Sequence, residues 1–82
     1  MISNQILKET ISGMKEVTGI DLCILDLSGR IVVTTMEVQE SLTEHATEFA
    51  ESMAESQVID GFQYFKIFDE QRLEYILLVN GM

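Results

Sequence analysis

Six polar side chains on or beside predicted strands are the residues of this sequence that could bind a small anionic molecule. Two of them, Arg30 and Lys66, are cations, and an arginine can hold a carboxylate through two parallel hydrogen bonds. The uncharged candidates are Thr34, Thr35, Gln63 and Tyr64. Together they predict a cleft for a small organic acid between the second helix and the strands. Arg30 directly follows a turn, so a solvated side chain without a ligand is the alternative interpretation.

Catalytic chemistry finds no support in the types and spacing of the reactive residues. His45 is the only histidine, and its position at the edge of an apolar helical stripe favours a structural role. Nothing in the spacing places it beside a serine, threonine or cysteine nucleophile. Asp21 and Asp26 are separated by an odd number of positions, which puts them on opposite faces of a regular strand. We therefore expect the protein not to be an enzyme.

Metal and cofactor chemistry is equally unsupported. The single cysteine, Cys23, lies in an apolar run, where cysteine acts as a small hydrophobe. One cysteine excludes an internal disulfide framework and a cysteine-based zinc site. No glycine-rich phosphate-binding motif is present. The sequence predicts no metal site and no cofactor.

The charge balance excludes another class of function. The chain has a formal net charge of −9, and no lysine or arginine lies between Ile31 and Phe65. A phosphate backbone repels such a surface, so we expect no direct nucleic-acid binding by this domain. No apolar run approaches the ~18 residues that a membrane-spanning helix needs, and no secretory signal is present. A cytoplasmic location without membrane contact is the expectation.

The first half of the chain predicts a helix followed by a β-hairpin. The helix is expected over residues 3–18, with its first serine as the N-cap and Gly19 in the left-handed position that ends it. The strands Ile20–Asp26 and Arg30–Met36 follow, joined by a turn that contains Asp, Ser and Gly. Both strands are apolar on both faces, which predicts that both are central and covered.

The second half predicts a helix over residues 41–56. Ser41 and Glu44 have the spacing of a capping box at its start. An apolar stripe on this helix consists of Leu42, Ala46, Phe49, Ala50 and Met53. The opposite face is acidic, which is typical of a solvated surface, and its members are Glu44, Glu48, Glu51 and Glu55.

A second hairpin is predicted at the end of the chain. Its strands are Val58–Phe68 and Leu73–Val79, joined by a four-residue turn, Asp69–Arg72. The last strand carries no charge from Tyr75 onward, so as an exposed edge it would invite strand pairing. The fold class is therefore a small α/β (α+β) domain over residues 1–82, with the order α-β-β-α-β-β and a mainly antiparallel sheet.

The arrangement resembles the N-terminal sensor domain of sugar-diacid-type (carbohydrate diacid) transcriptional regulators. The opening Ile-Ser-Asn-Gln is similar to theirs, and residues 21–32 resemble their pattern of a strand, D-x-x-G-R-I and a second strand. The resemblance implies a bacterial, cytoplasmic, PAS-like domain that senses a small metabolite and supports dimerisation. It also implies that residues 1–82 are a fragment of a longer regulator, whose DNA-binding helix-turn-helix lies elsewhere.

Two functions remain open from the sequence. The first is a sensory domain that binds a small organic acid. The alternative is a ligand-free dimerisation or interaction scaffold, in which Phe62, Phe65 and Phe68 fill the space that a ligand would need. A homodimer is expected in either case, with Ile2, Ile6 and Met14 of the first helix as candidate contacts.

Overall fold

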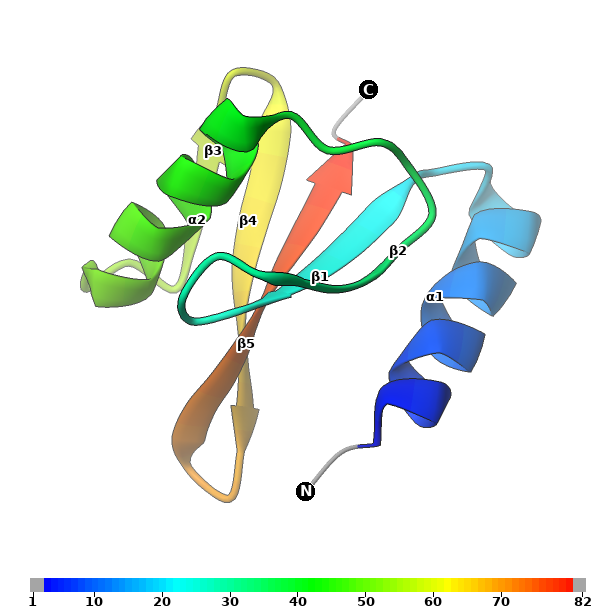
Figure 1. The fold of residues 1–82 in the computed structure, drawn as a ribbon, viewed down its shortest axis with the longest axis horizontal. Helices are drawn as coiled ribbons and strands as arrows, with labels where there is room; N and C mark the ends of the chain where they lie inside the picture. The colour runs from blue at the N-terminus through cyan, green and yellow to red at the C-terminus, as the bar shows by residue number, and fades with distance from the viewer. Residues whose placement is uncertain (1–2, 81–82) are drawn as a thin grey trace.

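A five-stranded antiparallel sheet forms the centre of the computed structural model, which describes residues 3–80 (Figure 1). The sheet order is β2-β1-β5-β4-β3, and each neighbouring pair is antiparallel. The elements are, in chain order, α1 (Asn4–Thr18), β1 (Leu22–Asp26), β2 (Ile31–Thr34), α2 (Glu40–Glu51), β3 (Ser56–Ile59), β4 (Phe62–Asp69) and β5 (Arg72–Asn80). The predicted α+β class with a mainly antiparallel sheet is confirmed, with one strand more than expected.

The two helices cover opposite faces of the sheet, and β1 carries apolar side chains to both. Leu22 and Ile24 pack in the core beneath α1, whereas Cys23 and Leu25 pack in the core beneath α2. In Figure 1, α1 lies beside β1 and β2, and α2 lies over the other end of the sheet. The prediction of a central strand covered on both faces is confirmed for β1.

The same prediction is wrong for β2, which pairs with β1 alone and forms one edge of the sheet. Val32 and Val33 are half-buried and pack toward α1, while Ile31 is 40% exposed. Apolar composition reports what covers the faces of a strand, and it does not report whether a second strand pairs with its outer edge.

Helix α1 begins and ends at the predicted residues. The Ser3 hydroxyl accepts a hydrogen bond from the Ile6 amide at 3.1 Å, which satisfies one of the free N–H groups of the first turn. Gly19 has φ 74° and its amide donates to the Lys15 carbonyl. Ile2, a predicted dimer contact, lies outside the described residues.

Helix α2 differs from its prediction at both ends. It begins at Glu40 with Gln39 as N-cap, and no side chain caps it, so the predicted Ser41 capping box is wrong. The half-buried Met36 and Val38 pack against the core just before the helix, so tertiary packing sets where it begins. The helix ends at Glu51, and Met53 is 99% exposed, so it is not part of the buried stripe.

The predicted strand Val58–Phe68 is two strands. Asp60 and Gly61 adopt φ 51° and 82° and join β3 to β4 in a two-residue turn. Asp-Gly is the preferred sequence for such a turn because both positions need positive φ. The strand prediction is wrong here because the aromatic run continues through the reversal.

The last turn and the last strand also differ from expectation. The turn between β4 and β5 is the two residues Glu70 and Gln71, both with positive φ, and not a four-residue loop. Strand β5 lies between β1 and β4, so the last strand is not an exposed edge that could pair with another chain. Neither helix within residues 3–80 is long and apolar enough to cross a membrane.

Candidate functional site

The structure does not gather the six predicted ligand residues into one place. Arg30 is exposed at the turn before β2, whereas Thr34 and Thr35 lie at the other end of that strand. Gln63 faces the α1 side of β4, and Tyr64 and Lys66 face the α2 side. Apart from the pairs Thr34–Thr35 and Tyr64–Lys66, the six residues are therefore separated from one another by the length of a strand or by the sheet itself.

The predicted cleft beneath α2 is filled by protein side chains. Tyr64 is fully buried, and its hydroxyl donates to the Leu42 carbonyl at 3.2 Å. Its ring lies 5.9 Å from the ring of Phe49, centroid to centroid. Burial raises the pKa of Tyr64 to about 12, so the hydroxyl is neutral at physiological pH. The scaffold alternative placed Phe62, Phe65 and Phe68 in this space. Phe49 and Tyr64 fill it instead, Phe62 packs against the same core, and Phe65 and Phe68 are partly exposed.

The Lys66 side chain contacts the C-terminal end of α2. Its ammonium donates to the Ser52 carbonyl and lies 5.1 Å from the centroid of the Phe49 ring. A cation at the C-terminal end of a helix interacts favourably with the carbonyls that have no helical partner. The side chain thus has a structural role that competes with ligand binding.

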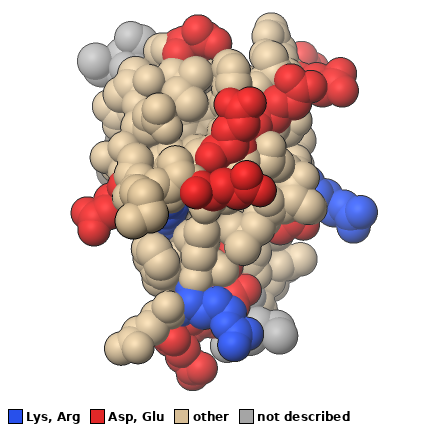
Figure 2. All heavy atoms as spheres, turned by 90° about the vertical axis from the view of Figure 1, so that its left-hand side faces the viewer, with Lys and Arg blue, Asp and Glu red and all other residues tan. Residues whose placement is uncertain are grey.

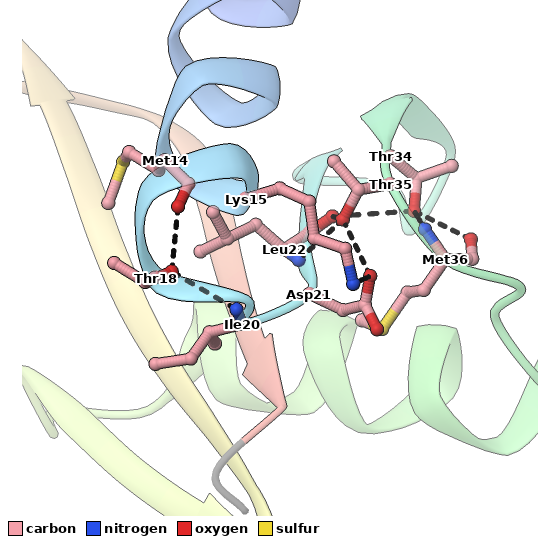
Figure 3. A network of polar contacts seen from close by, with 9 residues as sticks. All are labelled: Met14, Lys15, Thr18, Ile20, Asp21, Leu22, Thr34, Thr35 and Met36. Atoms are coloured by element: carbon pink, nitrogen blue, oxygen red, sulfur yellow. Dashed lines mark hydrogen bonds and ion pairs between the residues drawn. The ribbon is translucent and has the colours of Figure 1, made fainter.

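The two threonines belong to a polar joint between α1 and the first hairpin (Figure 3). The Thr35 hydroxyl accepts from the Leu22 amide at 2.9 Å and contacts the Asp21 carboxylate at 3.1 Å. Lys15 closes the joint with an ion pair to Asp21 at 2.8 Å. The hydrogen bond from Lys15 lowers the pKa of Asp21, against a smaller opposing effect of burial. This joint ties the end of α1 to β1 and β2.

The turn that carries Arg30 is built around Asp26. One Asp26 carboxylate oxygen accepts from the Ser28 amide, the Ser28 hydroxyl and the Arg30 amide, at 2.9, 2.6 and 3.0 Å. Partial burial would raise the pKa of Asp26, but these hydrogen bonds outweigh it and lower the pKa. Asp26 thus shapes the turn, and the Arg30 side chain is left at the surface.

The reactive groups do not form a catalytic or metal site in residues 3–80. No group of three or more His, Cys, Asp or Glu side chains is placed to hold a metal ion within this range. Cys23 is fully buried, as predicted, and burial raises the pKa of its thiol. His45 is half-buried, and the nearest described carboxylate, that of Asp60, lies 3.9 Å from its Nδ1.

The most distinctive surface of the molecule is an apolar groove that sequence analysis missed. It runs between α1 and the sheet and has a volume of about 320 Å³. Its lining consists of Met14, Thr18, Ile20, Leu22, Phe65, Leu77 and Val79. The Thr18 hydroxyl is the polar group at this wall, and it already donates to the Met14 carbonyl and accepts from the Ile20 amide.

A second groove adjoins the first and shares Phe65 with it. It has a volume of about 390 Å³ and is lined by Ser56, Gln57, Val58, Gln63 and Phe65. None of the described residues that line either groove is charged, although 23% of the chain is. We call the lining of these two grooves the charge-free face.

Helix α1 extends this uncharged surface. Ile6, Thr10, Gly13 and Val17 follow one another at intervals of three or four residues, which places them in one row beside Met14. Val17 is 87% exposed and Ile6 is 56% exposed. Glu9 and Glu16 flank this row, each three or four residues from one of its members, whereas Lys8 and Lys15 lie on the other side of α1.

The acidic residues gather on the opposite side of the sheet. The exposed carboxylates of α2 and the segment after it are Glu40, Glu44, Glu48, Glu51 and Glu55. Figure 2 views the molecule from the side that carries α2 and shows a band of Asp and Glu side chains across it. The sheet therefore separates a strongly acidic surface from the charge-free face.

The sequence contained a signal for this face that strand prediction alone did not use. Phe65, Leu77 and Val79 alternate with the buried Tyr64, Ile76 and Leu78, so both faces of β4 and β5 are apolar. Because α1 lies largely over β1 and β2, it covers its side of β4 and β5 only in part: Leu77 and Val79 pack against the core beneath α1 but remain half-buried. No protein-family model, curated protein or solved structure matches the chain.

Proposed function

We propose that this chain is a protein-interaction domain, a ligand-free scaffold within a larger, sensor-type regulator. The observation that carries the proposal is the charge-free face, an apolar surface bordered by the uncharged polar residues Thr18, Gln57 and Gln63. An apolar centre with a polar rim is the usual anatomy of a protein–protein interface. Contiguous exposed apolar patches on folded domains mark interaction sites.

A receptor for a sugar diacid is less well supported by the geometry. A dianion needs a cation or several free hydrogen-bond donors, and preferably a bidentate arginine. The apolar groove offers neither, and the space beneath α2 is occupied by Phe49 and Tyr64. We therefore favour the interaction scaffold over the small-molecule sensor. A PAS-like architecture and a role in a bacterial transcriptional regulator remain part of the proposal, supported by the five-stranded antiparallel sheet and the D-x-x-G-R-I turn.

A dye experiment tests whether the folded chain presents this face. Nile red is uncharged, so the net charge of −9 does not repel it. We expect the dilute protein to enhance its fluorescence, and Phe65→Asp to abolish most of that enhancement. Phe68→Asp is the matched control, because Phe68 is on the same strand and is 56% exposed, but lies outside the charge-free face. Equal effects of the two variants would contradict the proposal.

A thermal-shift panel tests the competing receptor function. A ligand at 100 times its dissociation constant stabilises a protein by about 2.7 kcal/mol, which moves the midpoint of a small domain by several degrees. We expect no such shift with sugar diacids or other small organic acids. A reproducible shift that disappears in Arg30→Ala or Lys66→Ala would overturn the proposed function.

A further inference from the structure

We propose that the occupant of the charge-free face is a second copy of this chain, which packs on it about a two-fold axis. This inference rests on the proposed function and names its partner. The partly covered α1 sides of β4 and β5 in the two copies stack on each other, with Phe65 near the centre of the contact. The uncharged row of α1 in each copy then lies beside β3 of its partner.

Charge favours a second copy over a charged partner. The chain has a net charge of −9, so a basic partner would be drawn to the acidic surface on α2, on the opposite side of the sheet. A charged partner could form no ion pair on a charge-free face. Two charge-free faces can meet without burying an unpaired charge. Two copies that meet there bring no carboxylate of either groove lining into the contact, and their acidic helices point away from each other.

The shape of the surface is self-complementary. Each copy has a ridge, α1, beside a stretch of sheet formed by β5, β4 and β3 that α1 covers only in part. Stacked sheets lie about 10 Å apart, which is about the thickness of one helix. When these stretches stack, α1 therefore reaches the level of the partner's sheet and meets its edge. That edge is β3, which is uncharged and carries Val58 at 65% exposed.

The available area is in the range that a dimer needs. A standard interface buries about 800 Å² on each partner, which is roughly a seventh of the 5475 Å² surface of this chain. The contact would cover the two adjoining grooves and the uncharged row of α1. It would also bury the side chains of Val17, Val58 and Phe65, which the single chain leaves 87%, 65% and 36% exposed.

Sedimentation velocity of the purified chain between 5 and 500 µM tests the proposal. We expect a reversible dimer of the 9.3 kDa chain. Phe65→Asp should weaken the association at least tenfold, and Val58→Asp, at the exposed edge of the sheet, should weaken it without risk to the core. Phe68→Asp should leave it unchanged. Circular dichroism confirms that each variant is folded.

Salt provides a second, independent result. Because both copies carry a charge of −9 and the contact has no ion pairs, raising sodium chloride from 0.05 to 0.5 M should tighten the dimer by screening the repulsion. A monomer at 500 µM in high salt would overturn the proposal that a second copy occupies the charge-free face. A dimer that survives both Phe65→Asp and Val58→Asp would overturn it as well. Neither result affects the interaction-domain proposal, which fails only on the dye and thermal-shift experiments.

Discussion

The Tyr64 hydroxyl lies in the core beneath α2 and donates one hydrogen bond there, to the Leu42 carbonyl at 3.2 Å. Tyr64→Phe removes this contact and keeps the ring against Phe49. We expect the free energy of unfolding at neutral pH to fall by about 0.5–1.5 kcal/mol, the net value of a typical hydrogen bond. Urea unfolding followed by circular dichroism measures it. A loss above about 3 kcal/mol would mean that the ring itself has moved.

The same residue predicts a loss of stability in alkali. The pKa of Tyr64 is raised by burial to about 12 from an ordinary value of 10.0. Because the folded-state pKa lies above the unfolded one, this contribution is fully present below pH 10 and is lost as the pH rises through 12. The wild-type chain should therefore lose stability between pH 10 and 12 more steeply than Tyr64→Phe. Parallel unfolding curves for the two proteins over this range would contradict the burial of the hydroxyl.

At the scale of the elements, the β1–β2 turn is held directly against α2. A Cβ at Gly29 would lie 2.9 Å from Cγ2 of Thr47 and 3.1 Å from the Thr43 carbonyl oxygen, and Gly29 has φ 90°. Gly29→Ala should therefore destabilise the fold by about 1–3 kcal/mol through backbone strain and the clash. Gly13→Ala is the control, because nothing lies within 4 Å of its Cβ position and it is inside α1. It should stabilise by about 0.5–1 kcal/mol, and thermal unfolding at low protein concentration measures both.

The start of α2 offers a stabilising substitution. Gln39 is the N-cap and makes no side-chain cap hydrogen bond. Gln39→Ser should gain about 0.5–1 kcal/mol, because a serine hydroxyl can accept from an amide of the first turn. Ser41→Ala should cost little, since Ser41 is already inside the helix. If Ser41→Ala instead costs about 1 kcal/mol and Gln39→Ser gains nothing, the helix begins at the capping box that the sequence predicts.

Local signals made most elements predictable, and long-range pairing was not predictable. Ser3 and Gly19 mark the ends of α1 through side-chain and backbone chemistry within a few residues, and both act as expected. The position of β5 between β1 and β4 depends on pairs such as Leu22 with Val79, which no local pattern specifies. Gln63 and Tyr64 were placed together as ligand residues although adjacent residues of a strand face opposite sides of a sheet in any register, as these two do in β4.

At the scale of the whole molecule, the net charge of −9 opposes folding as well as association. Bringing 14 carboxylates and only 5 basic groups into a compact shape costs free energy through self-repulsion. We expect the thermal midpoint of the dilute monomer to rise between 0.05 and 0.5 M sodium chloride, because salt screens that repulsion. The rise should be smaller in Glu48→Gln/Glu51→Gln, which removes two exposed carboxylates from α2. An equal rise in both proteins would show that the acidic band is not its source.

The pairing of β1 with β5 sets an order of events during synthesis on the ribosome. Leu22, near the beginning of the chain, lies opposite Val79, near its end. β1 therefore emerges long before the strand that pairs with one of its edges, and that edge stays unpaired until nearly the whole chain has been made. The three last strands, by contrast, join through two-residue turns and can form as they emerge. The nascent first hairpin is thus the segment most exposed to wrong partners, and slower translation of its codons would prolong that exposure without changing the finished protein.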